Sequence, residues 1–177
     1  MEHLIIAAVA FLGLFTMIAS IDGLYFHLWK YRLHTRPQTL YEHKLHTVRA
    51  FLFIPTVFFL FLKNFAGTVL WLGMLVVLFD LGIEMMDVLC ERDSRASIGG
   101  LSSAEYAVHV LATTVRIAAI ALILAAKPAQ AWRLSAPTTM GDYPALVTYA
   151  ALNIIAVSAV VGGLHIWLMQ KKYRLAV

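Results

Sequence analysis

The segment FDLGIEMMDVLCE, residues 79–91, decides the fold of this chain. It ends an apolar run that begins near Thr68, and its acidic side chains recur at intervals of four, three and four residues. A helix places all of them on one face. Ionisable groups are costly in hydrocarbon, so this face should turn toward the interior of a helical assembly that supplies cations. The acidic residues are Asp80, Glu84, Asp87 and Glu91.

Composition places the chain among membrane proteins. Hydrophobic residues make up 61% of the 177 residues, with a mean hydropathy of +0.78, whereas soluble domains are about 45–50% apolar. We therefore expect an all-α integral membrane protein, a single domain over residues 1–177. The lone Cys90 excludes a disulfide framework. The net charge of +4 is not arranged as a basic patch interleaved with aromatics, so no nucleic-acid partner is expected.

Apolar runs of about 20 residues predict transmembrane helices. Five such runs are separated by short polar connections or by proline, which stops a helix. The prediction is a bundle of about five transmembrane helices, over residues 4–33, 41–62, 68–92, 104–126 and 145–170.

Basic residues are distributed unequally between the two ends of such a bundle. The end with fewer holds Lys63, Lys127 and Arg133. Since cytoplasmic loops are enriched in Lys and Arg, the other end should be cytoplasmic. This predicts a multi-pass protein of the inner (cytoplasmic) membrane, with its N-terminus outside and its C-terminus in the cytoplasm. The basic residues of the richer end are Lys30, Arg32, Arg36, Lys44, Arg92, Arg95, Lys171, Lys172 and Arg174.

Histidines and carboxylates gather near the same end of the predicted bundle. At 1.5 Å per residue, each helix carries one at a depth of roughly 8–15 Å. Imidazole with carboxylate, in the absence of thiolate, favours iron, manganese or zinc over calcium. The expected metal ligands are Glu42, His46, Glu84, Asp87, Glu105 and His109, followed by His27 and His165 as ligands or orienting partners, and by His43.

Other polar residues are expected to surround the predicted ligands without binding the metal themselves. Arg116 lies deep in its helix and should pair with Asp22 or Asp80, because an unpaired buried charge is untenable. His34 is expected to be solvated at the membrane interface. The alternative without a metal is a purely structural network of polar residues that holds no ion. The predicted supporting residues are Asp22, Asp80, Arg49 and Arg116.

Di-iron carboxylate bundles use a related scheme, with Glu-x-x-His pairs from two helices and a Glu from each of two more. Here Glu42/His46 and Glu105/His109 are spaced by four residues instead of three, so the likeness is one of ligand type and helix placement. It favours an integral-membrane oxidoreductase with a dinuclear non-haem iron site. Its substrate would be lipid-soluble, such as an acyl chain, a quinone or an isoprenoid. The sequence provides no sizeable extramembrane domain, so electrons would come from a donor protein or a larger membrane complex.

Three other functions fit the same residues. Two imidazoles on different helices could bind haem b in an electron-transfer protein. Acid and histidine chains also serve as proton relays, so a proton- or metal-ion-translocating protein, or an accessory subunit of a membrane complex, remains open. A zinc-dependent membrane hydrolase would need two histidines and an acid around an activated water.

Overall fold

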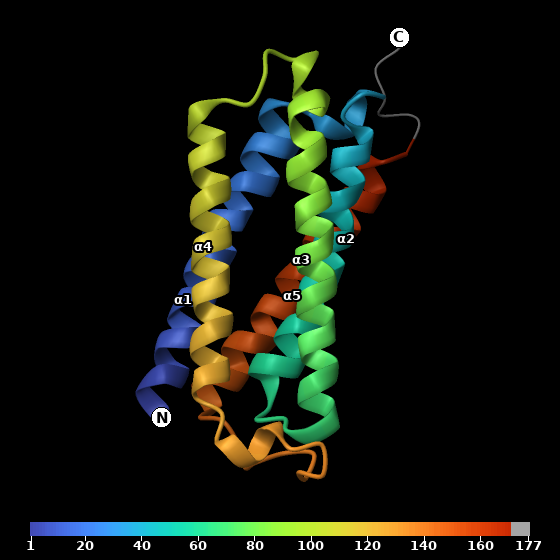
Figure 1. Cartoon of the computed structure of the whole chain (residues 1–177). Coiled ribbons are helices and arrows are strands. Elements are labelled where there is room, and N and C mark those ends of the chain that lie inside the picture. Colours follow the sequence, from blue (N-terminus) through green and yellow to red (C-terminus); the bar gives the residue numbers. More distant parts are fainter. Residues whose placement is uncertain (171–177) are drawn as a thin grey trace.

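The computed structural model describes residues 1–170, and the predicted basic tail at Lys171, Lys172 and Arg174 lies outside the described residues. Within residues 1–170 the fold is all-helical, with no strand beyond an isolated bridge between Phe65 and Thr139. Five helices are long and apolar enough to cross a membrane (Figure 1). The predicted all-α bundle of five long helices is therefore confirmed.

The helices follow the predicted order with shifted ends. The first ends at Lys30 instead of residue 33, because Arg32 adopts a left-handed conformation with φ of 51°. The third continues to Ala96, four residues beyond the predicted end. The long elements are α1 (Glu2–Ser20) continued by η1 (Ile21–Lys30), α2 (Leu40–Val57) continued by η3 (Phe58–Leu62), α3 (Gly67–Ala96), α4 (Ser103–Ala125) and α5 (Ala145–Leu168); η2 (Leu33–Thr35) and η4 (Ala129–Trp132) are short turns.

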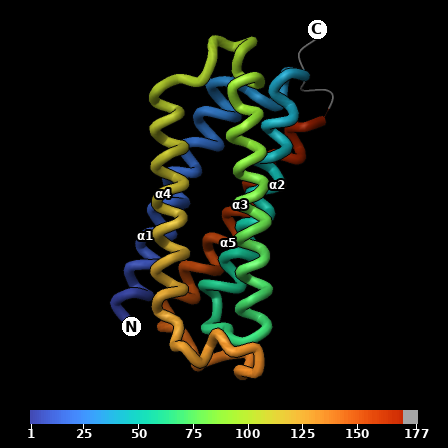
Figure 2. Tube along the Cα trace, viewed as in Figure 1, coloured from blue at the N-terminus to red at the C-terminus, as the bar shows by residue number. Residues whose placement is uncertain are grey.

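The helices are arranged in two groups. α1 packs along α4, whereas α2 packs against both α3 and α5. Figures 1 and 2 show the N-terminus at one end of the bundle and, at the opposite end, the connection between α3 and α4 together with the end of α5. The two ends are called here the N-terminal end and the histidine end, the latter because His34 and His43 lie there.

Glycines allow α2 to lie close to both neighbours. A Cβ atom built on Gly73 of α3 would stand 2.8 Å from Cβ of Phe59. One built on Gly162 of α5 would stand 2.9 Å from the ring of Phe51. The Cβ of Phe59 cannot move without its helix, so Gly73 sets the separation between these helices, whereas at Gly162 the contact is with the tip of the Phe51 ring.

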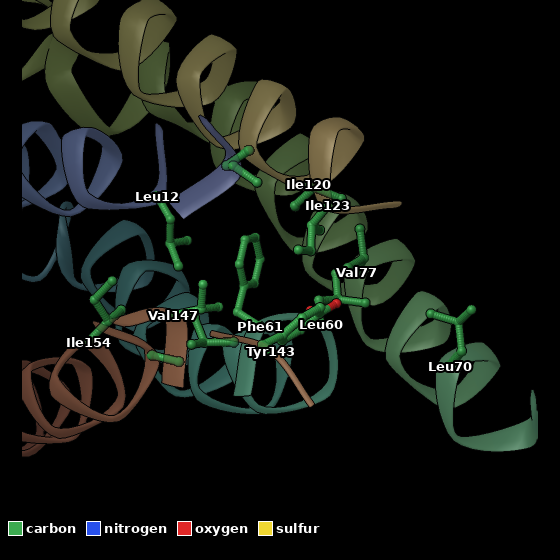
Figure 3. Packing of buried hydrophobic residues seen from close by; sticks show 14 of the residues in the cluster. Leu12, Leu60, Phe61, Leu70, Val77, Ile120, Ile123, Tyr143, Val147 and Ile154 are labelled. Atoms are coloured by element: carbon green, nitrogen blue, oxygen red, sulfur yellow. The ribbon is translucent and has the colours of Figure 1, made fainter. Parts of the chain in front are cut away.

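A continuous apolar core fills the half of the bundle toward the N-terminal end. Leu12, Phe61, Ile123 and Val147, from four different helical segments, meet there, and all are at most 1% exposed (Figure 3). Lys127 closes this end, where its ammonium donates to Asn64 Oδ1 and to the Phe65 carbonyl. The other half of the interior is polar and contains the candidate site.

Candidate metal centre

The polar half of the interior carries an excess of negative charge. Within residues 1–170 it holds seven buried or half-buried carboxylates against three arginines, a surplus of four negative charges before the histidines are considered. Buried charges are expensive unless they are paired or bind ions. The carboxylates are Asp22, Glu42, Asp80, Glu84, Asp87, Glu91 and Glu105, and the arginines are Arg49, Arg95 and Arg116.

Two arginines compensate the acids in the middle of the bundle. Arg116 bonds to both Asp80 and Glu84, as the sequence predicted for Asp80. Arg49 approaches the same two carboxylates, with Nη2 2.8 Å from Glu84 Oε1 and Nε 3.7 Å from Asp80 Oδ1. Glu84 also accepts from the hydroxyl of Thr113 at 2.8 Å. Glu84, predicted as a metal ligand, thus has its oxygens engaged by protein donors.

The third arginine occupies the histidine end. Arg95 is fully buried, with Nη2 2.7 Å from Glu42 Oε1 and 2.6 Å from Glu105 Oε1. Its guanidinium lies 5.0 Å from the Tyr31 ring. Ser94 donates to Glu42 Oε2 at 2.5 Å. The structure therefore places Glu42, expected to share a metal with His46, in an ion pair with Arg95.

Further acids and imidazoles form a group that includes Glu105, the acid paired with Arg95. This group is called here the histidine–carboxylate cluster. His109 Nε2 lies 2.8 Å from Asp22 Oδ1 and 3.3 Å from His27 Nε2. His27 Nε2 in turn lies 3.5 Å from Asp22 Oδ1 and 3.6 Å from Glu105 Oε1. Four helical segments contribute to it. Its members are Asp22 and His27 of η1, His46 of α2, Glu91 of α3, and Glu105 and His109 of α4.

Two overlapping sets of three ligand atoms lie close enough to share an ion. Asp22, His27 and His46 form one set, and His27, Glu105 and His109 form the other; within each set the ligand atoms lie within 4.8 Å of one another. Donors bound to one ion at about 2.0–2.1 Å stand roughly 2.9–3.4 Å apart in octahedral or tetrahedral geometry. Within the sets, His27 Nε2 lies 3.3 Å from His109 Nε2, inside that range, and 3.5 and 3.6 Å from the oxygens of Asp22 and Glu105, just beyond it.

Three short contacts of the cluster are not aligned as hydrogen bonds, although the Nε2 atoms of His27 and His109 share a hydrogen bond at 3.3 Å. Asp22 Oδ1, His46 Nε2 and Glu91 Oε1 are buried and have no hydrogen-bond partner among residues 1–170. Asp22 Oδ1 and Glu91 Oε1 nevertheless lie 2.8 and 3.0 Å from the two ring nitrogens of His109. His46 Nε2 lies 3.2 Å from Asp87 Oδ2. Asp22 and His46 are both possible metal ligands, so these unpaired lone pairs could bind an ion.

The π-helical geometry of η1 brings Asp22 and His27 to the same face. These residues are five apart, so an α-helix would turn them away from each other. Hydrogen bonds in a π-helix join residues five apart, and the Tyr31 amide donates to the Phe26 carbonyl at 2.9 Å in this way. Such segments are frequent at functional sites. This conformation moves Asp22 from its predicted supporting position into the cluster.

His109 has the arrangement of a metal ligand oriented by a carboxylate. Its Nε2 faces Asp22 and His27, while its Nδ1 lies 3.0 Å from Glu91 Oε1. In metal sites the second ring nitrogen usually pairs with a carboxylate or a carbonyl, which fixes the ring. His46 Nε2 lies 3.2 Å from Asp87 Oδ2, so Asp87 stands at the edge of the cluster.

Three further histidines lie apart from the cluster, toward the histidine end. The rings of His43 and His165 are stacked, with centroids 4.8 Å apart and planes inclined by 13°. The lone pairs of imidazole lie in the ring plane, so two nearly parallel rings do not aim at one ion. The ring of His34 lies 5.8 Å from that of His43 and is only 8% exposed, so the expectation of a solvated His34 is wrong.

A cavity of about 170 Å³ adjoins the cluster. Its polar wall includes Asp22, His46 and His109, and its apolar wall includes Phe15 and Phe53. Cavities of roughly 150 Å³ hold a molecule the size of benzene. His109 is 19% exposed, so this wall is not sealed from the surroundings of the bundle.

The structure brings together five of the predicted residues: His27, His46, Glu105 and His109 in the cluster, and Asp87 at its edge. It sets apart Glu42, Glu84, His43 and His165. From the sequence, Arg95 was counted only among the basic residues of the predicted cytoplasmic end, and Glu91 was given no separate role. The four-residue spacing of Glu91 from Asp87 and of Arg95 from Glu91 is the signal that places these residues on the buried face.

Comparison with known proteins gives no relative: no family model, no curated protein and no solved structure matches this chain.

Proposed function

We propose that the chain is an integral-membrane metalloprotein, with its histidine end at the cytoplasmic face of the inner membrane. Its five apolar helices support the embedding. Lys30, Arg32, Arg36 and Lys44 favour the orientation, because they lie at the histidine end.

The observation that carries the metal assignment is the proximity of imidazole and carboxylate atoms in two sets of possible ligands, with Asp22 Oδ1 and His46 Nε2 left without a hydrogen bond. The ligands in this proposal are Asp22, His27, His46, Glu105 and His109, with Glu91 orienting His109. Arg95 holds Glu105 through Oε1, and Glu105 Oε2 has no partner within residues 1–170. That second oxygen is available to an ion.

Two observations favour a dinuclear site. The two sets share His27 and together contain five possible ligands, one more than a single four-coordinate ion takes. With every carboxylate ionised and every histidine neutral, the formal surplus of four carboxylates over arginines equals the charge of two divalent ions. Oxygen and nitrogen donors without sulfur suit iron, with manganese and zinc as the competing metals.

The reaction we propose is an oxidation or reduction of a lipid-soluble substrate, with the iron supplying the redox chemistry. The cavity supports this class of substrate, because it joins the polar cluster to apolar walls from several helices. The electron donor would be a membrane or soluble partner. A haem is less favoured, because this half of the interior holds seven buried or half-buried carboxylates, and haem ligation by two imidazoles needs none of them.

Elemental analysis and an optical spectrum of the detergent-purified protein test this proposal. We expect about two iron atoms per chain and no Soret band. Replacing His27 and His109 together by alanine should lower the metal content at least tenfold.

His3→Ala is the matched control, because His3 is exposed at the far end of the bundle and should keep the wild-type metal content. Metal content well below one ion per chain in the wild type, including after incubation with ferrous, manganous and zinc ions, would refute the metal assignment. Full metal content in the double variant would refute the ligand set.

A further inference from the structure

We propose that His34, His43 and His165 conduct protons from the histidine end of the bundle to the cavity. The inference rests on the proposed embedding in a membrane and is independent of which metal, if any, the cluster binds. Histidine chains inside membrane proteins commonly serve as proton relays.

The three rings form a continuous series through the bundle. His34 lies in the turn before α2, where the Thr39 hydroxyl holds that turn by donating to the Leu33 carbonyl at 2.6 Å. The ring of His34 is 5.8 Å from that of His43, which is stacked on His165 at 4.8 Å. His165 lines the cavity. The series therefore begins near the end of the bundle and ends at the candidate site.

The hydrogen bonds fix which nitrogen carries the proton on two of these rings. His43 Nε2 lies 3.2 Å from the His165 carbonyl, which only accepts, so Nε2 of His43 must donate. The Thr47 hydroxyl donates to the His43 carbonyl at 2.8 Å and therefore accepts from His165 Nδ1 at 3.5 Å. The lone pairs are thus left on His43 Nδ1 and His165 Nε2.

Both of these lone pairs are buried without a partner among residues 1–170, as is Nδ1 of His34. Each ring can accept a proton without losing a hydrogen bond. In the transfer, His43 takes a proton at Nδ1 and passes the same proton on from Nδ1 through a bridging water to His165, while its Nε2 keeps donating to the His165 carbonyl. His165 takes a proton at Nε2 and then releases it to the cavity. Because the ring centroids are 4.8 and 5.8 Å apart, each transfer needs a ring rotation or one bridging water.

Other routes for protons into the cavity are poorer. The apolar core and the Lys127 closure fill the half toward the N-terminal end. A second line of buried polar groups at the histidine end runs through Glu42 and Glu105, but the guanidinium of Arg95 stands between them, and its permanent charge repels a proton.

Exchange of imidazole N–H protons with D₂O, followed by NMR of metal-free, ¹⁵N-histidine-labelled protein in lipid nanodiscs, tests the relay. The signals to follow are those of the ring nitrogens of His165, which is 2% exposed, because His109 is 19% exposed and can exchange without the relay. In the wild type they should exchange rapidly or be broadened by exchange. The variants His34→Leu and His43→Gln should slow this exchange at least tenfold.

His43→Gln separates conduction from structure. Glutamine can still donate to the His165 carbonyl but cannot carry a proton by becoming charged, so a purely structural role predicts wild-type exchange in this variant. His34 lies at the end of the bundle, so His34→Leu tests the path without opening the interior, and His3→Leu is the control at the far end. Equal exchange rates in the wild type, His34→Leu and His43→Gln would overturn the relay. Since the protein is metal-free, that result is distinct from a failure of the metal assignment.

Discussion

Replacing Arg116 by methionine should destabilise the bundle strongly without emptying the metal site. Arg116 is 1% exposed and pairs with Asp80 and Glu84. Removing one partner of a buried ion pair costs about 3–5 kcal/mol, because the other charge stays buried and unpaired. Here Arg49 Nη2 remains 2.8 Å from Glu84 Oε1, so we expect the lower limit, about 3 kcal/mol. At about 2–4 °C per kcal/mol for a domain of this size, the Tm should fall by about 6–12 °C.

Thermal unfolding in detergent, followed by circular dichroism, measures this loss. The double variant Asp80→Asn, Arg116→Met also removes the charge of Asp80, which Arg116 compensates in the wild type. This variant should recover at least half of the lost stability. Both variants should keep the wild-type metal content, because neither residue belongs to the histidine–carboxylate cluster. A Tm within 2 °C of wild type for Arg116→Met, or no recovery in the double variant, would show that these ion pairs do not support the fold as we reason.

Three further substitutions test the packing and the closed end of the bundle. Gly73→Ala should lower the free energy of unfolding by about 1–3 kcal/mol, because the new methyl group pushes α3 away from Phe59. Gly82 has open space around it, so Gly82→Ala should leave stability unchanged or raise it slightly. Equal melting temperatures for the two variants would contradict the close approach at Gly73. Burial lowers the pKa of Lys127 from 10.5 to about 8. Between these two pH values the folded state binds fewer protons than the unfolded state. The stability of the wild type relative to Lys127→Met should therefore rise as the pH is raised from about 8 to about 10.5. A stability difference between the two proteins that does not change with pH would refute this effect of burial.

The sequence was sufficient to predict the helices because hydropathy and helical periodicity are local properties. The stripe from Asp80 to Glu91 is buried in part as expected, and Arg116 meets Asp80. Spacing alone also indicated that His27, His46, Glu105 and His109 lie near one level of the bundle.

What the sequence did not reveal depends on conformation and on side-chain reach. An assumed α-helix through residue 33 turns Asp22 away from His27, and only the π-helical η1 brings them together. The extension of α3 to Ala96 carries Arg95 inward, where it pairs with Glu42 and Glu105. A long arginine side chain can reach any of several carboxylates. Its partners are therefore decided by how the helices pack and not by the spacing of residues in the sequence.

The central claim is that imidazole and carboxylate groups of η1, α2 and α4 jointly hold metal ions. X-ray absorption spectroscopy at the iron edge on the purified protein tests it most directly. We expect a shell of nitrogen and oxygen atoms at about 2.0–2.2 Å, with the outer scattering of imidazole rings that is lost in the His27→Ala, His109→Ala variant. A sulfur shell, a porphyrin signature, or the absence of bound metal from protein reconstituted with ferrous iron would contradict the account.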